Sequence, residues 1–105
     1  MNPKPPESIL TEALRVTGGD RQENYGHPLA NHKRIAILWN GYLAARAVDA
    51  AGVSQPTQPE LEPSDVAAMM LLLKVARHFH TKKRDNLTDA AGYIRCISRI
   101  ENFEP

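Results

Sequence analysis

Apolar residues recur at intervals of three and four along most of the chain, which is the spacing of one face of an α-helix. The first such segment starts after Ser8, a residue type that caps helices, and runs from Ile9 to Leu14. The glycine pair Gly18-Gly19 would end this helix, because glycine takes the left-handed cap conformation without steric penalty. The pattern therefore predicts a short first helix with one apolar side.

A second helix is expected from Leu29 to about Ala51, where Ala, Leu and Arg dominate. Its apolar residues do not form a single stripe, because Ile37 and Leu38 widen the apolar arc. A wide arc predicts contact with several helices or with another subunit. Residues 52–63 follow with three prolines and are expected to be the longest irregular connection.

A third helix is expected to begin at Pro63, since proline suits the first helical position, and to run through Phe79. Residues 66–79 are apolar on nearly every side, most clearly in the run 66–73, which predicts a central buried helix. Asp85 or Asn86 would cap a fourth helix that reaches about Asn102.

Gly92 lies in the middle of this fourth helix, where glycine is about 1 kcal/mol less favourable than alanine. Its presence predicts the close approach of another backbone or of a ligand. No segment has the alternation of a confident strand. We therefore expect an all-α fold of four main helices, with residues 1–7 as an extended lead-in and residues 8–102 as a single helical domain.

Composition narrows the possible partners. The 105 residues include 13 basic and 12 acidic residues, a net charge of +1, so no bulk nucleic-acid binding and no attraction to an anionic membrane is expected. The single cysteine, Cys96, cannot form an intramolecular disulfide or a cysteine-based metal cage. The longest apolar run is far shorter than the ~20 residues of a membrane span, and no signal peptide is evident. These features predict a cytoplasmic protein.

The loop between the first two helices, residues 18–28, carries a concentration of polar and aromatic side chains without apolar periodicity. Loops of this kind often present side chains to a ligand. Arg21, Tyr25 and His27 are the candidate ligand-binding residues here, with Tyr25 stacking on a base and Arg21 meeting its phosphates. The alternative is that Tyr25 packs over the loop with its hydroxyl bonded to a helix end.

Lys74 and Arg77 interrupt the apolar third helix three residues apart. Both side chains are hydrogen-bond donors only, so they can form a phosphate clamp on a rigid helix. The alternative is that they pair with Asp85 or Asp89 of the next helix, or cover apolar surface with their stems. Both arrangements can hold at once.

Asp85 and Asp89 can ligate magnesium together with Asp65, since hard oxygen ligands suit this ion and it travels with nucleotide phosphates. The other interpretation is that Asp85 caps its helix and Asp65 favours the start of its own. Asp89 is followed four residues later by Tyr93, which places a carboxylate and a phenol on one face beside Gly92. Tyr93 is therefore a candidate ligand-binding residue.

Several segments in combination resemble an uncharacterised family of small phage and prophage helical proteins over roughly residues 9–97. The segments are Asn24-Tyr25-Gly26-His27-Pro28, Pro63-Ser64-Asp65-Val66-Ala67, residues 69–77 and Asp89-Ala90-Ala91-Gly92-Tyr93. That family is more distantly similar to the all-α nucleoside triphosphate pyrophosphatases of the MazG and dimeric dUTPase type. This resemblance implies a MazG-like helical bundle, a dimer or tetramer, nucleotide binding and Mg²⁺.

The chain departs from those pyrophosphatases at their metal-binding motifs. No Glu-Glu-x-x-Glu or Glu-x-x-Asp sequence occurs on the expected second or third helix, which offer basic residues instead. Basic groups bind phosphates but do not hold magnesium. The first hypothesis is a nucleotide-binding homo-oligomer that hydrolyses its ligand, as a pyrophosphohydrolase does, or sequesters it. The second is a non-enzymatic interaction module that acts on a host protein.

Overall fold

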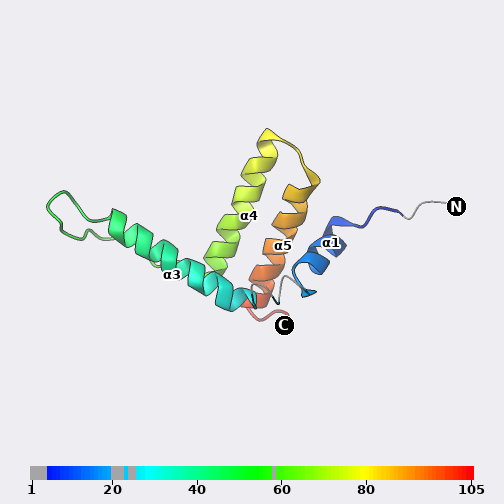
Figure 1. Cartoon of the computed structure of the whole chain (residues 1–105), viewed down its shortest axis with the longest axis horizontal. Coiled ribbons are helices and arrows are strands. Elements are labelled where there is room, and N and C mark those ends of the chain that lie inside the picture. The colour runs from blue at the N-terminus through cyan, green and yellow to red at the C-terminus, as the bar shows by residue number, and fades with distance from the viewer. Residues whose placement is uncertain (1–4, 20–22, 24–25, 58) are drawn as a thin grey trace.

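The structure, a computed structural model, describes residues 5–19, 23, 26–57 and 59–105. The described residues form helices and no strand, with a single isolated bridge between Val48 and Ser54. The expectation of an all-α chain with four helices is confirmed. The helices are α1 (Ile9–Val16), α3 (Pro28–Arg46), α4 (Pro63–His80) and α5 (Arg84–Ile100) (Figure 1).

Two of the helix starts follow the capping residues in the sequence. The Oγ of Ser8 accepts a hydrogen bond from the Thr11 amide at 3.0 Å and caps α1. At α4, Pro63 is the first residue, and the Glu62 amide donates to Asp65 Oδ2 at 2.8 Å. Asp65 therefore has a structural role at the start of its helix.

Two boundaries differ from the expectation. Helix α5 begins at Arg84 after Lys83, so Asp85 lies within the first turn and caps nothing. Helix α3 ends at Arg46, five residues before the expected end. The reason is Asp49, whose Oδ1 accepts from the amides of Ala51 and Val53 at 2.9 Å each and folds the chain into a turn.

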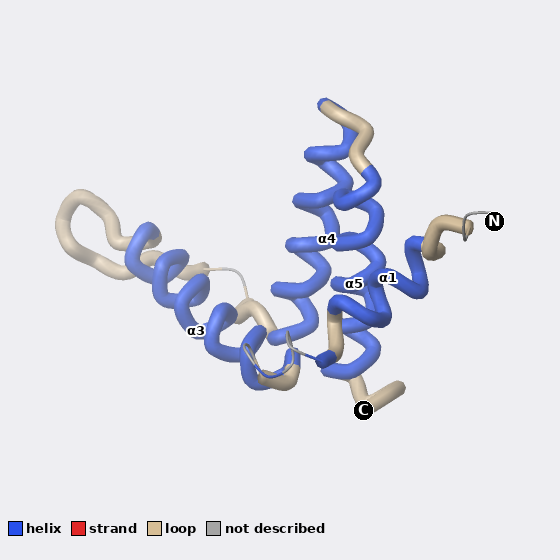
Figure 2. The backbone as a smooth tube through the Cα atoms, turned by 45° about the vertical axis from the view of Figure 1, so that its right-hand side comes forward, coloured by secondary structure: helices blue, strands red, loops and turns tan. Residues whose placement is uncertain are grey.

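The helices make a body with one projecting arm. Helices α4 and α5 run antiparallel side by side, α1 lies along α5, and α3 crosses the base of this pair and then leaves it (Figures 1 and 2). We call residues 41–57, the end of α3 and the following loop, the arm. The molecule measures 72 × 33 × 22 Å, and its radius of gyration of 17.4 Å exceeds the ~13 Å expected of a compact chain of this length.

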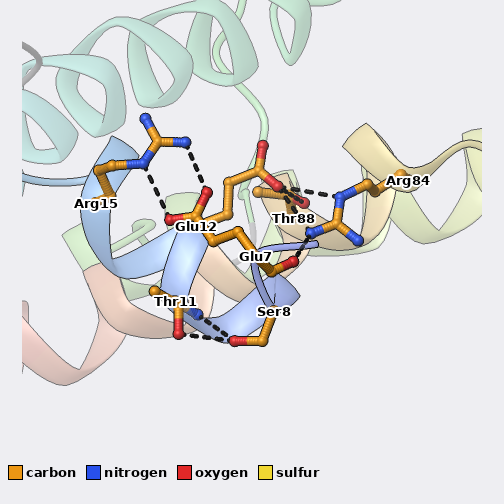
Figure 3. Close-up of polar contacts among 7 residues, drawn as sticks. All are labelled: Glu7, Ser8, Thr11, Glu12, Arg15, Arg84 and Thr88. Carbon is orange, nitrogen blue, oxygen red and sulfur yellow. Dashed lines mark hydrogen bonds and ion pairs between the residues drawn. The ribbon is translucent and has the colours of Figure 1, made fainter. Parts of the chain in front are cut away.

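Charged contacts fasten α1 to α5 (Figure 3). The guanidinium of Arg84 donates to the Glu12 carboxylate at 3.1 Å and to the main-chain carbonyl of Glu7. The Thr88 hydroxyl donates to the same carboxylate at 3.4 Å. These bonds join residues more than 70 positions apart and fix α1 along the first half of α5.

The core of this single chain is small. Its buried apolar side chains among the described residues are Ala13, Ala36, Val66, Ala67 and Ile100, of which Val66 is the only one larger than alanine that is fully enclosed. The expectation that the third helix is buried on all sides is wrong, since much of α4 is exposed. The physical reason is that α5 and the start of α3 cover one side of α4, and no described element covers the other. None of the helices in the described residues has the length and apolar character of a membrane span.

Candidate functional site

A cavity of about 440 Å³ lies where the first half of α3 meets α4, α5 and the end of α1. All four helices contribute to its wall. Val16, Ile35 and Met70 provide apolar surface. The polar and charged side chains that line it are Thr17, Asn31, His32, Lys74, Asp89, Tyr93 and Arg99.

Lys74 and Asp89 form an ion pair across this cavity wall. Lys74 Nζ lies 3.0 Å from Asp89 Oδ2, and the two side chains are 17% and 37% exposed. The interhelix pairing that the sequence offered as an alternative for Lys74 is thus confirmed with Asp89. An ammonium group has three N–H donors, so a bond to Asp89 does not exhaust its capacity. The ion pair with Asp89 therefore fixes the ammonium group of Lys74 at the cavity.

His32 presents a hydrogen-bond acceptor in the cavity wall. Its Nδ1 lies 2.8 Å from the Pro28 carbonyl, which can only accept, so Nδ1 carries the proton and Nε2 accepts in the neutral ring. Burial lowers the pKa of His32 and outweighs the opposing effect of the Pro28 bond. The rings of Tyr93 and His32 lie edge to face, with their centroids 6.4 Å apart. Together these rings form an aromatic wall.

Two arginines of α5 hold the end of α1 against the cavity. Arg99 Nη1 donates to the Thr17 carbonyl at 3.1 Å, and its Nε donates to the Pro105 carbonyl at 2.7 Å. Arg95 Nη1 donates to Thr17 Oγ1 at 2.8 Å and to the Leu14 carbonyl at 3.2 Å. These bonds satisfy carbonyls at the end of α1, which have no partner within the helix.

Gly92 lies directly beneath Thr17. A Cβ added at Gly92 would be 3.1 Å from Thr17 Cγ2, closer than a normal van der Waals contact. The sequence predicted the close approach of a backbone or of a ligand here. What approaches is the side chain of Thr17, so the glycine lets α1 and α5 pack closely.

Three of the candidate residues meet at the cavity: Lys74, Asp89 and Tyr93. Arg77 is exposed and lies outside the cavity lining, so the structure does not bring it to the cavity beside Lys74. His27 is the N-cap of α3, where its Nδ1 accepts from the Leu29 amide at 3.1 Å. Arg21 and Tyr25 lie outside the described residues.

The described residues do not fit a protein-held magnesium site. No three His, Cys, Asp or Glu side chains in this part of the chain gather closely enough to hold a metal ion. Asp89 is engaged by Lys74, and Asp85 is exposed and does not line the cavity. Asp65 lies in the first turn of α4 and Asp85 in the first turn of α5. Because the two helices are antiparallel, these residues lie at opposite ends of the helix pair.

Four polar residues of the cavity were not predicted from the sequence: Thr17, Asn31, His32 and Arg99. Helical spacing gives a signal for His32, because it precedes the buried Ala36 by four residues and therefore faces the same side. Arg99 has no such signal. Its position is set by the end of α1, 82 residues earlier in the chain.

The chain is similar to one protein family and to two phage proteins. The model of a family described as a domain of unknown function, DUF6378, matches residues 8–101. The Gene 55 protein of Mycobacterium phage D29 is 44% identical over 95 residues, which cover 90% of this chain and 54% of that protein. The Gene 55 protein of Mycobacterium phage L5 is 38% identical over 95 residues, 90% of this chain and 53% of that protein.

The chain therefore spans about half the length of the curated relatives it matches. No solved structure matches it. The family match covers all of the described helices, and the phage relatives agree with the expectation of an uncharacterised phage protein family. The chain belongs to the DUF6378 family.

Proposed function

We propose that this phage-type protein binds a nucleotide or a nucleotide-derived small molecule in the cavity between its four helices. The observation that carries the proposal is a cavity of about 440 Å³ in which a cationic Lys74 faces the same space as the His32–Tyr93 aromatic wall. Pockets for small ligands have volumes of ~300–1,000 Å³ and combine apolar walls with a few placed polar groups. A nucleotide matches this combination, because it carries an aromatic base and an anionic phosphate.

Each group has a role in this proposal. Lys74 meets phosphate and Asp89 orients the ammonium, since charge-assisted bonds to phosphate are among the stronger hydrogen bonds. The Nε2 of His32 accepts from an exocyclic amino group of the base, and Tyr93 contacts the ring. Arg21 and Tyr25 belong to the loop whose described neighbours Thr17 and Gly26 both line the cavity, so we include them as ligand contacts.

The chemistry of the cavity favours binding and sequestration over hydrolysis. A MazG-like pyrophosphohydrolase uses metal to neutralise phosphate charge and activate water. The described residues supply a lysine and not a cluster of carboxylates. Any magnesium would arrive on the phosphates of the ligand. We propose a MazG-like homo-oligomeric bundle that acts in the host cytoplasm and has kept the nucleotide pocket without the Glu-Glu-x-x-Glu motif.

A thermal-shift screen tests this proposal directly. Purified protein is heated with nucleoside mono-, di- and triphosphates and cyclic nucleotides, each with and without magnesium. A ligand at a hundred times its dissociation constant should stabilise the fold by about 2.7 kcal/mol. Chromatography of each positive mixture then separates an intact ligand from a hydrolysed one.

Matched variants locate the site. Lys74→Met removes the charge and keeps the apolar stem, so it should abolish the ligand-induced shift. Lys82→Met is the control, because Lys82 is exposed in the turn before α5 and lies outside the cavity lining. A shift lost in both variants, or kept in both, would contradict the assignment of Lys74. No shift with any nucleotide would overturn the proposed function.

A further inference from the structure

Helix α3 has two apolar sides, and only one is covered. At 100° per residue, the buried His32 and Ala36 lie on one side of the helix and the second stripe lies roughly opposite. This outer stripe contains Ile37, Leu38 and Tyr42, which are 62%, 72% and 67% exposed. Every residue from 41 to 46 is exposed, so no described element of this chain packs on the end of α3.

Helix α4 repeats this arrangement. Val66 and Ala67 are fully buried on its inner side. Large apolar residues recur at three- and four-residue spacing on the opposite side and are exposed: Met69, Leu72, Val75 and Phe79. Exposed apolar residues are normal when scattered singly, whereas a continuous stripe on each of two helices marks an interaction surface.

The amount of exposed surface matches that of a missing subunit. The chain exposes 7938 Å², whereas a compact monomer of 11.7 kDa exposes roughly 5,900 Å². The excess is about 2,000 Å² per chain. Two copies that each buried this excess would bury ~4,000 Å² in total, which lies in the range of obligate homodimers.

The arm has a defined structure although its helical residues 41–46 are all exposed. Asp49 organises the tip, and the Gln55 amide donates to the Ala47 carbonyl at 2.9 Å. At the arm's base, Asn40 donates to and accepts from the main chain of Leu61 at 3.1 and 2.9 Å. A helix without tertiary packing is marginal in water, so an ordered arm needs a surface to pack on.

We propose that a second copy of this chain covers the outer stripes of α3 and α4 in a twofold-symmetric dimer. Gly41 and Ala45 lie within the outer stripe of α3, four residues apart, and small residues at this spacing allow two helix backbones to approach closely. A twofold axis places each stripe against the same stripe of the other copy, so one apolar surface satisfies both. This interface rests on the homo-oligomer of the proposed function and specifies its surface, and it does not require nucleotide binding.

Sedimentation equilibrium and light scattering of the full chain test this proposal. The wild type at micromolar concentration should have twice the 11.7 kDa mass of one chain. Leu38→Glu and Leu72→Glu each place a charge in an outer stripe and should raise the dimer dissociation constant at least a hundredfold. Leu10→Glu is the matched control, because Leu10 is 74% exposed on α1 and lies outside both stripes.

A second variant guards against simple unfolding. A Cβ at Gly41 meets no atom of its own chain within 4 Å, and leucine is the better helix former, so Gly41→Leu should keep the helical content of the monomer. In the dimer its bulk separates the two α3 helices and should dissociate them. Circular dichroism and mass are measured on the same samples.

The outcomes decide the proposal. Dimeric wild type and Leu10→Glu with monomeric, helical Gly41→Leu would support it. A wild type of 11.7 kDa at micromolar concentration would overturn it and leave the stripes to a different protein. Dissociation by Leu10→Glu, with Leu38→Glu and Gly41→Leu still dimeric, would also overturn it.

Discussion

The body and the arm of this molecule differ in what they bury and what they expose. In the body, the side chains of His32, Thr88 and Arg99 are buried although they are polar, and each has a hydrogen-bond partner. In the arm, Tyr42 and Val53 are exposed although they are apolar. Buried polar groups and large exposed apolar patches are the informative departures from the usual distribution. The difference separates a cavity lined by polar groups from an exposed apolar surface.

The largest loss of stability is expected when a side chain is added at Gly92, which lies close to Thr17 in the body. Gly92→Leu should destabilise the protein by about 1–3 kcal/mol, because the added side chain meets Thr17 and overpacks the junction of α1 and α5. Urea unfolding measures the loss. The same change should also reduce nucleotide binding, since Gly92 and Thr17 line the cavity.

A double variant sharpens this test. Gly92→Ala should be destabilising in the wild type, because Thr17 is held in place by Arg95 and cannot easily move. Thr17→Ser removes the contacting methyl group and keeps the hydroxyl. In that background Gly92→Ala should stabilise the helix by up to about 1 kcal/mol. Equal effects of Gly92→Ala in both backgrounds would show that Thr17 does not restrict the side chain at position 92.

The next effect concerns the base of the arm. Asn40→Ala removes both hydrogen bonds to Leu61 and should cost about 1–2 kcal/mol. Hydrogen exchange should quicken in residues 47–57 and remain slow in α5. Asn86→Ala is the comparison, since it removes one exposed bond to the Thr81 carbonyl and should change exchange only near that turn. An unchanged arm in Asn40→Ala would show that the linker is held by other contacts.

The body should also respond to pH through His32. Burial lowers the pKa of His32 in the folded state, so near pH 6 the unfolded chain binds a proton that the folded chain does not. Stability is therefore lost as pH falls below the unfolded pKa of ~6.5, by up to about 1.4 kcal/mol on going from about pH 7.5 to about pH 5.5.

The control for this pH effect is His32→Asn, whose amide can still donate to the Pro28 carbonyl but does not titrate. The charges that share the cavity with His32 are Lys74, Asp89 and Arg99, and they remain in the variant. Unfolding is measured at each pH for both proteins. Identical pH profiles would contradict the assignment of the effect to His32.

The smallest change in stability is expected for the ion pairs at the surface. One of them, Arg84–Glu12, joins α5 to α1, whereas Arg15–Glu7 joins α1 only to the residues just before it. Arg84→Ala removes the bonds from α5 to Glu7 and Glu12 and should cost about 1 kcal/mol or less, since Arg84 is partly exposed. Arg15→Ala removes only the exposed pair with Glu7 and should leave the unfolding midpoint unchanged. A larger loss in Arg15→Ala than in Arg84→Ala would reverse this ranking.

Much of the local structure could be predicted from the sequence. Ser8 and Pro63 mark helix starts because capping depends on neighbouring backbone groups. The pairing of Lys74 with Asp89 was one of two stated interpretations, and the structure contains it. Local rules failed where several signals competed, as at Asp49, whose side chain ends α3 although the helical pattern continues beyond it.

The cavity was only partly predictable. Lys74, Asp89 and Tyr93 were candidates because charged and aromatic side chains on the faces of helices need a ligand or another side chain to interact with. Arg99 was not, because its partners belong to α1 and the C-terminus and not to any nearby motif. Arg77 shows the opposite error, since a spacing of three residues placed it beside Lys74 in sequence while the packing left it outside the cavity.

The sequence sets most helix positions, the helix starts at Ser8 and Pro63, and the apolar residues on both sides of α3 and α4, because these depend on residues within one or two turns of each other. Which side is covered depends on how the helices pack against each other. Helix α3 crosses the base of α4 and α5 and then departs, so polar residues are enclosed at the crossing and apolar residues remain exposed beyond it. That outcome depends on contacts between distant segments, which no local pattern encodes.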